Sequence, residues 1–126
     1  MAYQISWYMG RRIIYVLIQG EYLSLADLQA INDQLLPFIR HSDAPHAHVI
    51  IDASSVTTMQ SQLFDRMALS YLREPDLGWT IVIAPDAVAQ QFRPLFARTR
   101  SFESFTSPEE GMFFLEDEDA SLLMPA

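Results

Sequence analysis

The amino-acid sequence predicts an α/β fold: one domain with a mixed, mostly parallel sheet and the element order β-β-α-β-α-β-α-β-α. Short apolar runs rich in β-branched and aromatic residues alternate with longer segments whose apolar residues recur at helical spacing. Such alternation is typical of right-handed β-α-β units, which build a parallel sheet. The chain has 126 residues, 50% of them hydrophobic, and we find no internal repeat or linker, so a single core suffices.

Two strand-like segments open the chain, at 3–9 and 12–19, separated by Gly10 and Arg11. A short break that contains glycine favours a hairpin, so these two strands are expected to pair antiparallel. The second segment is too continuously apolar for a face in contact with water, whereas the first is less apolar and is expected at a sheet edge.

A capping pattern predicts that the first helix begins at Ser24, because its side chain can accept a backbone N–H while Asp27 favours the positive helix end. The apolar residues that follow form one stripe at helical spacing, at Leu25, Leu28, Ile31, Leu35 and Ile39. Pro37 lacks a backbone N–H and is expected to kink or end this helix.

The central segment carries the strongest functional signal. An apolar run from His48 to Asp52 predicts a buried strand, and an amphipathic stretch from about Gln60 to Leu72 predicts the second helix. The hydroxyl side chains between them are Ser54, Ser55, Thr57 and Thr58. A strand that delivers an acid and hydroxyls to a helix N-terminus predicts an anion or partner site, since the first helical amides lack partners.

The strand and helix alternation continues in the second half. Residues 79–84 are expected to form the next buried strand, and a third helix is expected from Pro85, with Pro94 disturbing its last turn. Residues 101–105 are expected to form a short final strand.

A cap, a proline and an acid at Ser107, Pro108 and Glu110 predict the start of a terminal helix. This helix is expected to carry three residues inward, Met112, Phe113 and Leu115. Four acids at 116–119 oppose the helix dipole, so we expect a domain over 1–116 and an acidic, frayed tail over 117–126.

Composition restricts the partners. The formal net charge is -8, which repels phosphate backbones and anionic lipid, so neither nucleic acid nor membrane is an expected partner. Cysteine is absent, which fits a reducing compartment. With neither a secretory signal pattern nor an apolar run of about 20 residues, the expected location is cytoplasmic.

The element order and the central segment resemble the STAS domain, also called the SpoIIAA-like or anti-sigma-factor antagonist-like fold. That family has a strand ending in Asp, a turn, and then Asp-Ser and a glycine that open a helix. Asp52, Val56 and Ser61 match this pattern, with Met59 in the apolar position before the pair.

Two departures make the chain a divergent member: Gln60 replaces the acid before the phosphorylatable serine, and Leu63 replaces the glycine. The resemblance implies a non-enzymatic regulatory module that binds a protein partner and can be phosphorylated at Ser61. The candidate partner-binding residues are Asp52, Ser54, Ser55, Thr57, Thr58, Gln60 and Ser61.

Two alternatives stay open. A sister group of SpoIIAA-like domains lacks the phosphoserine motif, and the likeness to it implies a carrier or sensor of a small apolar ligand. A homodimer is also expected to form through the edge strand, with Trp7, Tyr8 and Met9, and the apolar end of the chain.

Catalysis and cofactors have little support in the sequence. There is no Gly-x-Ser-x-Gly elbow or glycine-rich phosphate loop, so an enzyme is not expected. His46 and His48 are spaced to share one side of an extended segment, but a third ligand is not evident and no metal or other cofactor is expected. Asp52 with its neighbouring hydroxyls is expected to stabilise a turn rather than bind a cation.

Overall fold

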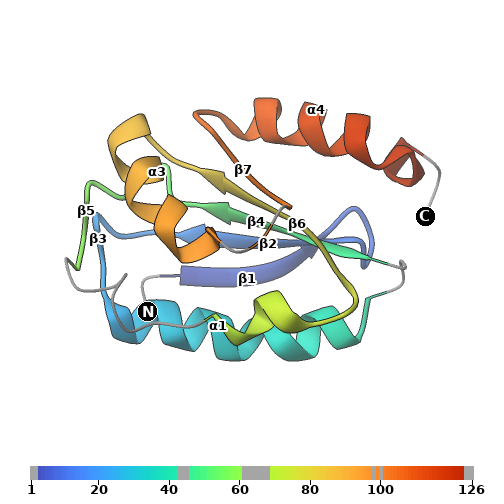
Figure 1. Cartoon of the computed structure of the whole chain (residues 1–126), viewed down its shortest axis with the longest axis horizontal. Coiled ribbons are helices and arrows are strands. Elements are labelled where there is room, and N and C mark those ends of the chain that lie inside the picture. The colour runs from blue at the N-terminus through green and yellow to red at the C-terminus, as the bar shows by residue number, and fades with distance from the viewer. Residues whose placement is uncertain (1–2, 43–45, 61–68, 98, 100, 124–126) are drawn as a thin grey trace.

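A sheet of five strands lies between two layers of helices in the computed structural model (Figure 1). The structure describes residues 3–42, 46–60, 69–97, 99 and 101–123. The strands are β1 (Tyr3–Tyr8), β2 (Ile13–Ile18), β4 (Ala47–Asp52), β6 (Leu77–Ile83) and β7 (Phe102–Phe105). They lie in the order β1-β2-β4-β6-β7, with β1 antiparallel to β2 and all other neighbours parallel. The predicted α/β class, hairpin and edge position of the first strand are confirmed.

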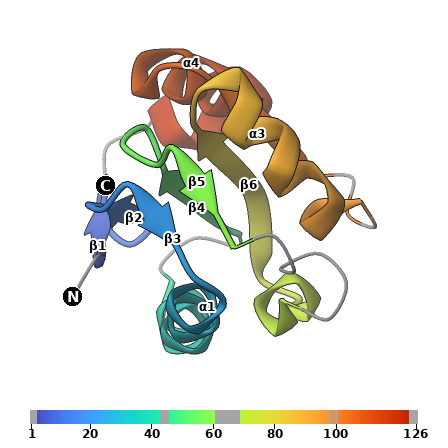
Figure 2. The ribbon, with the colours of Figure 1, turned by 90° about the vertical axis from the view of Figure 1, so that its left-hand side faces the viewer.

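Helical segments cover both faces of the sheet, with α1 on one side and α4 on the other (Figure 2). The helices are α1 (Leu25–Arg40), η1 (Ser70–Arg73), α3 (Asp86–Phe92), η2 (Arg93–Phe96), α4 (Pro108–Glu118) and η3 (Ala120–Leu123). Residues from α1, η1, α3 and η2 bury their side chains in one hydrophobic cluster, and α4 with η3 bury theirs in the other. The sheet therefore has a core on each face.

The strands alternate their side chains between these two cores. On β2, Ile14 and Val16 join the core under α1, whereas Ile13 joins the core under α4. All six residues of β4 are buried, because both faces of this central strand are covered. The two helical layers therefore explain why the sequence of the central strands is continuously apolar.

A small second sheet was not expected from the sequence. It consists of β3 (Tyr22–Leu23) and β5 (Thr58–Met59), which pair in parallel. Each strand buries one residue, Leu23 at 1% and Met59 at 7% exposure. Two residues are too few to show the alternation of apolar and polar side chains that marks a strand in a sequence, so these strands are recognised only by their pairing in the folded structure.

Pro37 was expected to kink or end the first helix. The helix does not end there, because α1 continues through Pro37 to Arg40. Pro37 is exposed, and the buried stripe extends past it to Ile39, which is 1% exposed. One missing hydrogen bond near the end of a helix is offset when the same turn packs a buried residue. Pro94 has the expected effect: α3 ends at Phe92, and the chain continues as the 3₁₀ helix η2.

Two expectations for the C-terminal helix are corrected. Phe113 does not point inward and is 72% exposed, while Phe114 packs edge-on against Trp79 with ring centroids 4.8 Å apart. Gly111 and Leu115 mark the buried line of α4, which puts position 113 on the opposite side. Over the described part of the expected tail, up to residue 123, the chain is helical: α4 extends to Glu118, and η3 follows with Leu122 buried.

The predicted second helix falls mostly on residues 61–68, which lie outside the described residues. Its last part is described: Tyr71 and Leu72 belong to η1. Asn32 on α1 holds η1 in place, accepting from the backbone N–H of Tyr71 at 3.0 Å and donating to the Ser70 hydroxyl at 3.0 Å. Across the described ranges, no helix has the length and apolar character needed to span a membrane.

Close packing of α4 on the sheet depends on Gly111. A Cβ atom at this position would lie 2.9 Å from Cδ1 of Ile83 and 3.1 Å from Cγ2 of Ile81. We therefore expect Gly111→Leu to push α4 off the sheet and lower the free energy of unfolding by about 1–3 kcal/mol. Urea unfolding measures this change. Asp117→Leu, an exposed change on the same helix, is the control, with an expected effect within about 0.5 kcal/mol; equal effects of the two variants would contradict the packing argument.

Candidate functional site

The candidate site lies where the parallel strands β2, β4 and β6 end. Asp52 is the last residue of β4, and the chain then turns through residues 53–57 into β5. In open sheets of parallel strands, ligands commonly bind outside the carboxyl ends of the strands. The structure therefore brings the predicted site residues that it describes to a favourable edge of the fold.

Asp52 is 6% exposed, and both of its carboxylate oxygens are engaged. The Tyr15 hydroxyl donates to Oδ2. The backbone N–H and the hydroxyl of Ser54 donate to Oδ1, at 3.1 and 2.6 Å. A buried carboxylate needs such donors to offset its lost hydration, so Asp52 anchors the turn.

Tyr15 stays a neutral phenol in this arrangement. Burial first, and then the hydrogen bond and the negative charge of Asp52, raise the pKa of Tyr15 well above its ordinary value. The hydroxyl therefore keeps the proton that it donates to Asp52. Sequence reasoning missed this partner, since Tyr15 lies on β2 and reaches Asp52 only through the pairing of β2 with β4.

The hydroxyl residues of the turn face the solvent. Ser54, Ser55, Thr57 and Thr58 are all exposed, and we call these four residues the turn surface. The backbone N–H groups of Thr57 and Thr58 donate to the carbonyl of Glu21 at 2.8 and 3.1 Å. The turn surface is thus held at both ends, by Asp52 and by Glu21.

Gln60 has a structural role that the sequence did not indicate. Its side-chain Oε1 accepts the backbone N–H of Leu25, the first residue of α1, at 2.9 Å. The Ser24 side chain accepts from Asp27 at 3.1 Å, as predicted, so α1 is capped by two side chains. Ser61, the candidate phosphorylation site, lies outside the described residues.

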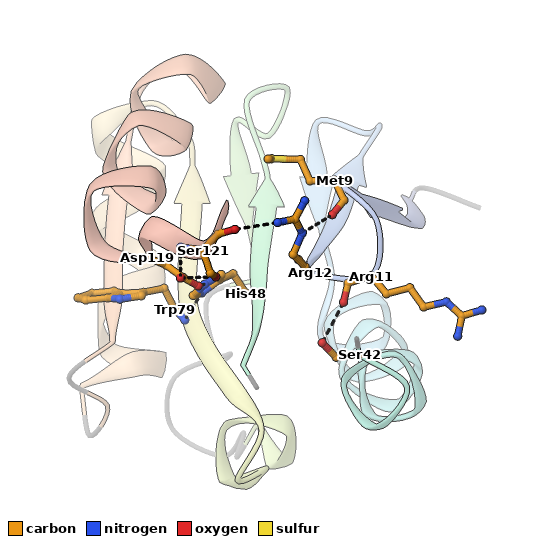
Figure 3. A network of polar contacts seen from close by, with 8 residues as sticks. All are labelled: Met9, Arg11, Arg12, Ser42, His48, Trp79, Asp119 and Ser121. Carbon is orange, nitrogen blue, oxygen red and sulfur yellow. Dashed lines mark hydrogen bonds and ion pairs between the residues drawn. The ribbon is translucent and has the colours of Figure 1, made fainter. Parts of the chain in front are cut away.

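A second polar network, drawn in Figure 3, joins β4 to the C-terminal segment. The backbone N–H of Trp79 donates to His48 Nδ1 at 2.9 Å, which places the ring proton on Nε2. Nε2 in turn donates to Asp119 Oδ2 at 2.7 Å. Arg12 donates to the carbonyl of Ser121 at 2.8 Å, so the segment is tied to the hairpin as well.

These contacts account for His48 without a metal. Both of its ring nitrogens have protein partners, and Gly78 leaves the space for the ring: a Cβ there would lie 2.4 Å from Nδ1. His41 lies elsewhere, at the end of α1, with its Nδ1 2.6 Å from the carbonyl of Pro37. Among the described residues, no group of three or more His, Asp or Glu side chains is arranged to hold a metal ion.

Asp119 is held as a carboxylate. Its partial burial favours the neutral acid, but hydrogen bonds from Ser121 and His48 outweigh that effect and lower the pKa of Asp119. These bonds also explain why the acidic end of α4 remains ordered, against the expectation from the helix dipole.

Comparison with solved structures shows an α/β fold of the SpoIIAA-like, or STAS, class. The structure of the anti-sigma factor antagonist SpoIIAA in its unphosphorylated form gives a TM-score of 0.66 at 15% identity, covering 92% of this chain and 97% of that chain. An uncharacterised protein with a SpoIIAA-like fold from Shewanella loihica gives 0.61 at 14% identity, covering 90% and 92%.

A third solved structure is similar, that of the Bacillus cell fate determinant SpoIIAA in its phosphorylated form. Its TM-score is 0.58 at 15% identity, covering 90% of this chain and 99% of that chain. No protein-family model and no curated protein sequence matches the chain. The expected SpoIIAA-like fold is confirmed.

The Tyr15 hydroxyl is expected to stabilise the site. We predict that Tyr15→Phe lowers the free energy of unfolding by about 1–3 kcal/mol, because Oδ2 of the buried Asp52 loses its donor. Urea unfolding measures the loss. Tyr8→Phe, in which the parent ring is exposed, is the matched control and should change stability by less than about 0.5 kcal/mol. A Tyr15→Phe protein as stable as the parent would refute this role.

The lowered pKa of Asp119 predicts a pH dependence. Because the folded pKa lies below the unfolded one, the stabilisation is complete above the ordinary aspartate value of about 4 and is lost as pH falls through the folded pKa. Asp119→Asn keeps an acceptor for His48 but removes the charge.

Urea unfolding of parent and Asp119→Asn across this pH range tests the assignment. The difference in unfolding free energy should be constant near neutral pH and shrink as the pH falls below about 4. Asp117→Asn, an exposed neighbour on α4, should show no such trend. A difference independent of pH would mean that the charge of Asp119 is not what stabilises the segment.

Proposed function

We propose that this chain is a non-enzymatic regulatory module that binds a protein partner on the turn surface and is phosphorylated at Ser61. The observation that carries the proposal is the exposure of four hydroxyl residues at the carboxyl edge of a SpoIIAA-like sheet. Serine and threonine hydroxyls can both donate and accept. Those of Ser54 and Thr57 already donate, to Asp52 Oδ1 and to the carbonyl of Glu21, and offer a partner their acceptor sites. Their backbone is already fixed by Asp52 and Glu21, so little entropy is lost on binding.

The similar solved proteins support a regulatory role. One is described as an anti-sigma factor antagonist, and SpoIIAA has been solved in both unphosphorylated and phosphorylated forms. Ser61 corresponds to the phosphorylatable serine of the family pattern in the sequence. A phosphate at that position would add about two negative charges beside the turn surface and change its affinity for a partner.

The engagement of Asp52 supports a binding role rather than catalysis. Its two oxygens accept from Tyr15 and Ser54, so the carboxylate acts as an anchor for the turn. We propose the cytoplasm as the compartment, on the absence of cysteine. The homodimer through β1 and the alternative function as a carrier or sensor of a small apolar ligand both stay predictions.

A site-specific cross-linker tests the docking surface. A photoreactive amino acid at Ser55 is expected to capture a specific protein from a lysate of the host organism, because Ser55 lies in the turn surface. The same group at Asp117, on the exposed side of α4, is the positional control and should not capture it. Adding Thr57→Arg should lower the captured yield at least about tenfold, since a long cation replaces a small hydroxyl.

Capture of the same proteins at both positions would reject the docking surface. Phosphorylation is tested separately, by incubating the protein with ATP in that lysate and mapping residues 54–61 by mass spectrometry. Phosphate on Ser61, lost in Ser61→Ala, would support the regulatory part. Absence of phosphate across this range would remove that part and leave the docking surface standing.

A further inference from the structure

The face of the sheet under α4 is only partly covered. Within the described part of the chain, α4 contacts β6 and β7, and the surface over β1 and β2 forms a groove of about 780 Å³ beside the helix. The groove is lined mainly by Ser6, Tyr8, Met9, Tyr15, Met112 and Phe113. This volume lies within the usual range for small-molecule sites, about 300–1,000 Å³.

The walls of the groove are aromatic and apolar. Ser6 lies opposite Tyr15 in the β1 and β2 register, and the Tyr8 ring lies 6.3 Å from the Tyr15 ring, tilted by 58°. The Tyr15 hydroxyl is turned to Asp52, so this residue offers its ring to the groove. Phe113, which the sequence analysis expected inside, forms part of the opposite wall and is 72% exposed.

The charged residues that line the groove are all acidic. Glu109 and Glu116 come from the same side of α4, seven positions and about 10 Å apart along the helix axis. None of the lining residues in the described part of the chain is cationic. The tyrosine rings of the groove, that of Tyr8 exposed and that of Tyr15 half-buried, together with the two carboxylates favour a positive charge, through cation–π attraction and through charge pairing.

We propose that this groove is a binding site for a small amphiphilic organic cation, an aromatic or alkyl body that carries an ammonium group. The body lies against Tyr8, Tyr15 and Phe113, and the ammonium lies near Glu109 or Glu116. This site is separate from the turn surface and does not depend on the proposed function. A second copy of the chain is a poorer occupant, because its own net charge of -8 would face the same two carboxylates.

Three probes that share a phenylbutyl group and differ in their polar end group test the proposal: 4-phenylbutylamine, 4-phenylbutanol and 4-phenylbutyrate. Titrations followed by amide NMR on the full chain are expected to show saturable shifts at residues 6–9 and 108–116 with the amine. The amine should bind most tightly and the carboxylate most weakly. Equal affinities, or shifts located elsewhere, would overturn the proposal.

Matched variants separate charge from packing. Glu116→Gln and Glu109→Gln should each weaken the amine about twofold to fivefold and leave the alcohol unchanged. Asp117→Asn, an exposed acid on the same helix outside the groove, should alter neither. Phe113→Ala removes an exposed wall residue and should weaken all three probes while the fold stays intact. Unchanged amine affinity in the double glutamine variant would refute the charge argument.

The oligomeric state is measured in the same samples by light scattering without probe. The groove is expected to be free of a second copy, whether the chain is a monomer or a dimer paired through the edge of β1. If the chain forms a dimer, and dilution of that dimer shifts the amide signals of residues 6–9 and 108–116, a second copy occupies the groove. The proposal would then be wrong.

Discussion

The complete burial of the central strand β4 is the constraint on which the rest of the molecule depends. A parallel strand paired on both sides exposes its faces to water unless helices cover them, and six consecutive buried residues require cover on both faces. The core under α1 meets this need on one face, and α4 with η3 meets it on the other. The two helical layers follow from this one strand.

The same constraint explains both polar networks. β4 carries His48 and Asp52 on the face toward α4, both buried, and a buried polar group is costly without partners. His48 is satisfied by Asp119 and the backbone of Trp79, which fixes the segment that follows α4. Asp52 is satisfied by Tyr15 and Ser54, which fixes the turn surface. The polar residues near the two ends of the strand thus organise two distant surface segments.

Uneven cover of the sheet also leaves room for binding. On the side of α4, cover extends over β6 and β7 but leaves a groove over β1 and β2. Tyr15 connects the groove to the turn surface, because its ring lines the groove while its hydroxyl holds Asp52, which anchors the turn. The two surfaces are therefore neighbours in structure, although they differ in chemistry: hydroxyls in one, aromatic rings and carboxylates in the other.

The sequence by itself determined the α/β class, the hairpin, the strands of the main sheet and the helix starts at Ser24 and Ser107, because local periodicity and capping patterns are properties of neighbouring residues. Long-range contacts decided the rest. The exposure of Phe113, the position of η3 and the capping of α1 by Gln60 each depend on residues distant in the chain. Only the folded sheet brings Tyr15 to Asp52 and His48 to Asp119, since partners 37 and 71 positions apart share no local pattern.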